Sequence, residues 1–160
     1  MRKQLHIEEN EVGNKLLWEP AREEACSGVQ AENGNLVLLS SVSLFGNEKD
    51  LCVFAMAQTA NTLATRGAVI TGIELEILLP EFAYESRIKT MIAMAEEKAE
   101  AWKLPIMKAD VQIVPGIQTT IVQANALGTV QEDKLFRSSM AKPNQDIVLI
   151  GENAYELFIC

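Results

Sequence analysis

The stretch TANTLATRGAVITGIELEILLPE, residues 59–81, contains the change of periodicity that decides the fold. Its first part continues an apolar segment that starts at Leu51, and Arg66 followed by Gly67 is a typical signal for the end of a helix. Its second part alternates apolar and polar residues, and a period of two is typical of a half-buried strand. The stretch therefore predicts a helix over residues 51–66 that is followed directly by a strand.

The alternating part of this stretch assigns its side chains to the two faces of a sheet. The residues expected to point into the core are Ile73, Leu75, Ile77 and Leu79. Glu74 and Glu76 then point the other way. Two neighbouring glutamates could also form a catalytic carboxylate pair, but their alternation with apolar residues favours a solvated strand face.

The same two periodicities predict the remaining elements of the chain. A second helix is expected over residues 85–103, and further strands over residues 35–45, 106–114, 118–130 and 146–151. The sequence PGI at 115–117 separates two of these strands and predicts a hairpin-type connection between them. The aromatic residues interpreted as core anchors are Phe45, Trp18 and Trp102.

These elements predict an α+β fold, in which a mixed or antiparallel sheet is covered on one face by two helices. The second face of the sheet is then either wet or paired with another subunit. Pairing with a twin subunit would remove both an apolar face and exposed strand edges, so a homodimer is expected.

Composition and charge restrict the classes of function. A chain of 160 residues suits one domain, and 22 acidic against 14 basic residues give a net charge of -8. Such a chain is a poor partner for nucleic acid or for an anionic membrane. It has no signal peptide and no apolar run of the ~20 residues that a membrane span needs, so a cytoplasmic protein is expected. One histidine and three widely spaced cysteines predict no metal site.

The stretch 59–81, followed by a long amphipathic helix and then KADVQIV at 108–114, resembles the amino-terminal domain of the aminoimidazole ribonucleotide (AIR) synthetase superfamily. That superfamily includes a hydrogenase-maturation protein, selenophosphate synthetase and thiamine-phosphate kinase. The resemblance covers residues 35–130. It implies a segment 1–34 of uncertain structure before this core, and a linker with a terminal strand over 131–160 in place of the family's second domain.

The resemblance also implies ATP and Mg²⁺ as ligands, and amino-terminal domains that pair so that strands from two subunits form a barrel. At the positions of the family's ligand motifs, this chain mostly has other residues in place of the aspartates. Ser40, Ser41 and Val42 stand at the strand motif, Asn61 and Thr62 at the Asn-Asp helix motif, and Lys108, Ala109 and Asp110 at the Gly-Gly-Asp motif. The resulting candidate binding residues are Asn61, Thr62, Asp110, Lys108, Ser40 and Ser41.

Two of these positions have alternative interpretations. Lys108 and Asp110 lie two apart on a strand and share a face, so the ammonium could fill the space of a lost metal or contact a phosphate. They could equally form an exposed ion pair, and this interpretation is favoured because such pairs are common. Asn61 and Thr62 could face a site, or Thr62 could hydrogen-bond to its own helix.

The loss of two aspartates removes ligands that Mg²⁺ requires, and hydroxyl or isopropyl groups do not replace them. We therefore expect a non-catalytic homodimeric domain with a degenerate nucleotide or metabolite pocket and an assembly or regulatory role. It requires no cofactor, and no catalytic residue is assigned. The alternative is an ATP- and Mg²⁺-dependent enzyme that is represented by its ATP-binding amino-terminal domain.

Overall fold

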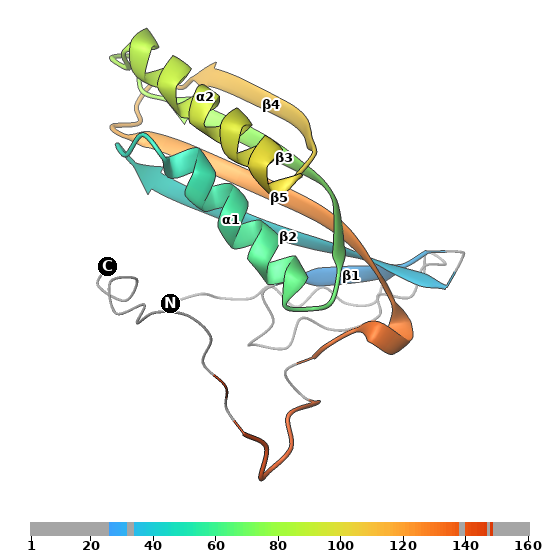
Figure 1. The fold of residues 1–160 in the computed structure, drawn as a ribbon. Helices are drawn as coiled ribbons and strands as arrows, with labels where there is room; N and C mark the ends of the chain where they lie inside the picture. The colour runs from blue at the N-terminus through green and yellow to red at the C-terminus, as the bar shows by residue number, and fades with distance from the viewer. Residues whose placement is uncertain (1–25, 32–33, 138–139, 147, 149–160) are drawn as a thin grey trace.

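The computed structural model describes residues 26–31, 34–137, 140–146 and 148. Within them, one five-stranded sheet carries two α-helices on the same face (Figure 1). The elements in chain order are β1 (Ser27–Gln30), β2 (Asn35–Gly46), α1 (Leu51–Ala64), β3 (Val69–Leu79), α2 (Glu85–Trp102), β4 (Ile106–Ile113), β5 (Thr120–Gln131) and the 3₁₀ helix η1 (Glu132–Lys134). The predicted α+β class is confirmed.

The strands follow the order β1-β2-β5-β3-β4 across the sheet. The pairs β1–β2, β2–β5 and β5–β3 are antiparallel, whereas β3 and β4 are parallel. The sheet is therefore mixed. Its outer strands are β1, which lies in the segment 1–34 expected to be of uncertain structure, and β4.

The predicted hairpin between β4 and β5 is wrong, because β3 lies between these two strands. The connection through α2 carries the chain back to the start of β3, so that β4 joins β3 in the parallel sense. The buried side of β5 includes the small residues Ala124 and Ala126, which suit a central strand below a helix. β4 instead exposes Met107 and Ile113, which suits an edge.

The core lies between the sheet and the helix layer. The predicted inward face of β3 is confirmed, since all four of its expected core residues are buried. The fully buried side chains around them include Leu36 and Leu38 from β2, Met56 and Leu63 from α1, Met91 from α2 and Val122 from β5. The hydrophobic effect of this burial fixes both helices on one face of the sheet.

α1 approaches the sheet closely where β5 has no side chain. A Cβ atom at Gly128 would lie 3.0 Å from the Val69 carbonyl oxygen and 3.3 Å from Leu63 Cδ1. After α1, the chain turns at Gly67, whose φ of 79° belongs to the left-handed region. Gly67 thus lets the chain turn from α1 directly into β3, and Gly128 leaves room for α1 to lie close to β5.

Two of the predicted core anchors are on the surface. Phe45 is 77% exposed, because the alternation of β2 points it away from the helix layer. Trp102 is 43% exposed in the last turn of α2. Trp18 and most of the expected strand 146–151 lie outside the described residues. In the part of the chain that the structure describes, no helix is long and apolar enough to cross a membrane.

Candidate functional site

The face of the sheet opposite the helices, called here the open face, carries a band of hydrogen-bonding side chains. They form two rows that follow the strand register from β2 through β5 and β3 to β4. One row is Ser41, Asn125, Glu74 and Lys108, and the other is Ser43, Gln123, Glu76 and Asp110. We call these eight residues the polar belt.

Apolar side chains flank the polar belt along the strands. On one side Phe45 pairs with Ile121, which pairs in turn with Leu78. On the other side Leu39, which is 40% exposed, pairs with Leu127. The open face therefore consists of a polar middle between two apolar ends.

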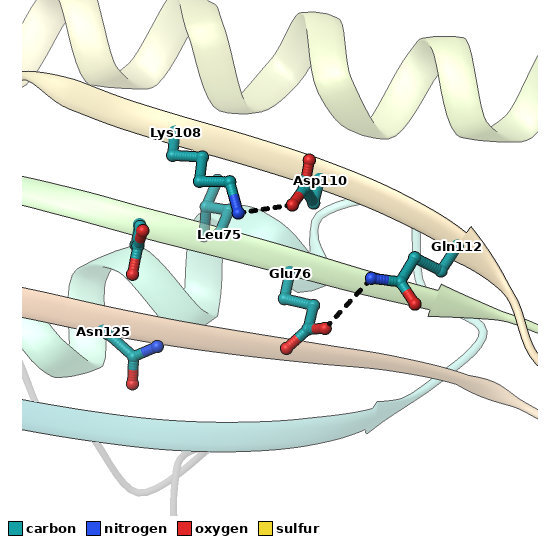
Figure 2. A pocket seen from close by; sticks show the side chains of 7 residues that line it. Leu75, Glu76, Lys108, Asp110, Gln112 and Asn125 are labelled. Atoms are coloured by element: carbon teal, nitrogen blue, oxygen red, sulfur yellow. Dashed lines mark hydrogen bonds and ion pairs between the residues drawn. The ribbon is translucent and has the colours of Figure 1, made fainter.

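A pocket of about 170 Å³ opens on the belt where β3 and β4 meet (Figure 2). Its lining consists of Glu74, Leu75, Glu76, Lys108, Asp110, Gln112 and Asn125. Gln112 Nε2 donates a hydrogen bond to Glu76 Oε1 at 3.5 Å. The wall of the pocket is thus mostly carboxylate, amide and ammonium groups.

Lys108 and Asp110 form an ion pair in this pocket, with 2.5 Å between Lys108 Nζ and Asp110 Oδ2 (Figure 2). The hydrogen bond to Asp110 and the charge of this carboxylate raise the pKa of Lys108, and the charges of Glu74 and Glu76 act in the same direction. The side chains are 58% and 47% exposed. This arrangement is the exposed pair that the sequence favours.

The structure brings together only part of the predicted site. Ser41, Lys108 and Asp110 share the open face, whereas Ser40 is buried on the helix side of β2. Asn61 and Thr62 belong to α1, which packs on the other face of the sheet. A single chain therefore holds these residues on opposite sides of the sheet, and they do not line one pocket.

The polar groups of α1 bond mainly to their own helix. Thr62 Oγ1 donates to the Gln58 carbonyl oxygen at 2.9 Å, which is the local alternative given above. Thr59 is fully buried, and its hydroxyl contacts the carbonyl oxygens of Ala55 and Met56 at 3.0 Å each. Asn61 is exposed. Hydrogen bonds within α1 thus explain how a largely apolar helix accommodates these threonines.

Sequence reasoning missed the contribution of β5 to the site. Gln123 and Asn125 sit next to Glu76 and Glu74, respectively, across the β3–β5 pair. Their alternation with buried alanines in QANA, residues 123–126, was the available signal, but the expected hairpin placed β5 beside β4 instead of β3.

The residues on the open face do not fit a magnesium-bound triphosphate. Mg²⁺ needs several oxygen ligands, and Asp110, the acid that the motif retains, already pairs with an ammonium group. Within the described ranges, no group of three His, Cys, Asp or Glu side chains could hold a metal ion.

Away from the open face, burial in α1 raises the pKa of the Cys52 thiol to about 11, so this thiol is protonated in neutral solution.

Comparison with solved structures identifies the fold. Thiamine monophosphate kinase from Aquifex aeolicus superposes with a TM-score of 0.54 and 11% identity over 61% of this chain and 35% of that chain. Escherichia coli HypE, a hydrogenase maturation protein, superposes with a TM-score of 0.58 and 17% identity, over 66% of this chain and 36% of that chain. The chain therefore shares its fold with part of each of these two proteins. A structure of HypE in complex with ATP superposes with a TM-score of 0.59 and 18% identity, over 67% of this chain and 34% of that chain.

The predicted resemblance is confirmed as a likeness of fold, which is what identities of 11–18% establish. The chain spans about a third of the length of each of these neighbours, with 34–36% of them covered. No protein-family model and no curated protein sequence matches the chain.

Proposed function

We propose that the chain is a non-catalytic domain with an AIR synthetase-related fold, and that its open face binds a second copy of itself. The observation that carries this proposal is the pattern of the open face. Phe45 is 77% exposed and Leu39 is 40% exposed on the side of the sheet that the helices leave free. Exposed apolar side chains on a strand face are typical of an interface, and a second copy would cover the two separate apolar ends together.

The chemistry of the polar belt supports a domain that does not use ATP. Transfer of a phosphoryl group needs cations around the phosphates, and the belt offers three carboxylates against the one ammonium of Lys108. The whole chain, with the belt included, has a net charge of -8. A free triphosphate is repelled by such a surface unless a metal intervenes. The pocket is better suited to a small metabolite, with a role in assembly or regulation.

The first prediction concerns nucleotide binding. ATP with Mg²⁺ is expected to raise the melting temperature of the protein no more than ATP alone, because the described residues offer no group of three acidic, thiol or imidazole side chains for the metal. A ligand that binds only the folded state stabilises it by mass action, so thermal shift measures this directly. The matched control is Asp110→Asn. A rise that requires Mg²⁺ and disappears in Asp110→Asn would contradict the proposal.

The second candidate function is an ATP- and Mg²⁺-dependent enzyme, of which this chain is the ATP-binding domain. The observation in its favour is that two of the structures with this fold were solved with nucleotides, one with ATP and one with AMPPCP and TMP. The same thermal-shift experiment separates the two functions. A magnesium-dependent rise favours the enzyme, and its absence favours the non-catalytic dimer.

A further inference from the structure

We propose that the pocket on the open face binds a short linear diamine in its doubly protonated form, with one ammonium group at Glu74 and the other at Glu76. This inference rests on the proposed function and deepens it, because it names the class of small metabolite that the pocket takes. The charge, the spacing and the volume of the pocket each favour this class of ligand.

The pocket carries negative charge that its own cation does not neutralise. Among the described residues that line it, Glu74, Glu76 and Asp110 are acidic and Lys108 is basic, so three carboxylates against one ammonium leave a net charge of -2. Lys108 is paired with Asp110 (Figure 2). Neither glutamate forms an ion pair with another described residue. A dication bound beside both glutamates would offset their mutual repulsion.

The two glutamates are spaced for a ligand with two charged ends. β3 is in regular register with both of its neighbours over Glu74–Glu76, so the Cα atoms of these two residues lie roughly 6.6 Å apart on one face. An extended chain advances roughly 1.2 Å per bond, and the five bonds between the nitrogens of α,ω-diaminobutane therefore span about 6 Å. Between the glutamates the pocket is lined by Leu75, whose side chain is buried on the helix side. The uncharged methylene groups of the ligand thus lie over uncharged backbone.

Each glutamate has a neighbouring amide that can contact the same ammonium group. Asn125 lies beside Glu74, and Gln123 lies beside Glu76, across the β3–β5 pair. The side-chain carbonyl oxygens of these amides accept hydrogen bonds, and an ammonium group has several N–H donors to satisfy. Gln112 Nε2 also donates to Glu76 Oε1 (Figure 2). The pocket therefore has two similar ends, each with one carboxylate and one amide.

The volume of the pocket suits a ligand of about six non-hydrogen atoms, since an apolar protein cavity of roughly 150 Å³ takes up benzene. The pocket measures about 170 Å³. α,ω-Diaminobutane has this size, and in neutral solution both of its amines are protonated, as the amine of lysine is. A metal ion fits less well, because the described residues offer no group of three acidic, thiol or imidazole side chains.

The test is a nuclear magnetic resonance titration of the whole chain in low salt, followed at the side-chain amide signals of Asn125 and Gln112. α,ω-Diaminobutane is expected to bind with a dissociation constant in the millimolar range. The two control ligands are n-butylamine, which has the same chain and one charge, and Mg²⁺, which has the same charge and no chain. Each control is expected to bind about five-fold more weakly. The binding of the diamine should weaken at high salt.

Matched variants locate the ligand in the pocket. Glu74→Gln and Glu76→Gln are each expected to weaken binding of the diamine about five-fold, because one of its two charged contacts is lost. Each of them should also remove most of the advantage of the diamine over n-butylamine. Glu96→Gln, on the exposed face of α2, makes the same change in net charge away from the sheet and should leave binding unchanged. Circular dichroism verifies that each variant is folded.

Equal affinities for the diamine, n-butylamine and Mg²⁺ would show that net charge alone attracts cations, and would overturn the inference. The inference is also overturned if Glu96→Gln weakens binding as much as the two pocket variants, or if neither amide signal shifts. Failure of the proposed function gives a different result. A magnesium-dependent thermal shift with ATP, or a monomeric chain, would contradict that function, whereas a dimer that does not bind the diamine would overturn this inference alone.

Discussion

Leu39→Glu is expected to convert the proposed dimer into monomers. Leu39 is 40% exposed at an apolar end of the open face, beside Leu127. In the dimer a glutamate there would be buried without a partner, and an uncompensated buried charge is strongly unfavourable. We expect the dissociation constant to rise at least about 100-fold, which corresponds to roughly 2.7 kcal/mol. In the monomer the same glutamate points to solvent, so the fold should survive.

Light scattering coupled to size exclusion measures this change, and Phe54→Glu is the matched control. Phe54 is 50% exposed on α1, in the helix layer, and it has the same side chain as Phe45 on the open face. Phe54→Glu is expected to leave the dimer intact. A dimer that tolerates Leu39→Glu but is lost in Phe54→Glu would move the interface to the helices.

The second large effect is expected at Gly67, where the chain turns from α1 into β3. Its φ is 79°, and a Cβ atom there would lie only 2.7 Å from the Lys134 carbonyl oxygen. Gly67→Ala therefore has two costs. The alanine must adopt an unfavourable left-handed conformation, and its Cβ displaces the backbone at Lys134. We expect the free energy of unfolding to fall by roughly 3 kcal/mol, and the melting temperature by roughly 5 to 10 °C.

Gly116→Ala separates these two contributions. Gly116 has a similar φ of 88°, but nothing lies within 4 Å of the position of its Cβ. This variant should lose only the backbone contribution, about 1 kcal/mol. Equal losses in the two alanine variants, measured by urea unfolding, would show that the close approach of Gly67 to the Lys134 carbonyl oxygen in η1 adds nothing to the cost.

Local patterns predicted most of the secondary structure. The periods of two and 3.6 located β2, α1, β3, α2, β4 and β5 within a few residues of their observed bounds, because side-chain alternation and helix-ending signals are local properties. The same alternation placed Glu74 and Glu76 outside the core. The inward residues of β3 followed for the same reason.

Strand order could not be predicted in the same way, because it depends on contacts between segments distant in sequence. PGI at 115–117 does turn the chain back, but β5 pairs with β3 and β2 instead of β4. The missed pairing hid the polar belt, since Gln123 and Asn125 become site residues only beside the two glutamates of β3. Phe45 was misassigned for a related reason, because an aromatic residue on a strand indicates burial without indicating by what.

The candidate binding residues show a further limit of motif matching. Ser40 and Ser41 are adjacent in sequence, yet the alternation of β2 points one toward the helices and the other onto the open face. A motif read along the chain treats them as one site. The structure assigns them to opposite sides of the sheet, so only Ser41 can take part in the chemistry of the polar belt.

The molar mass of the unmodified chain in solution tests most directly whether the open face joins two copies. Light scattering at micromolar concentration should give about 35 kDa, twice the 17.6 kDa of one chain. A mass of 17.6 kDa that stays constant as the concentration rises would contradict the account.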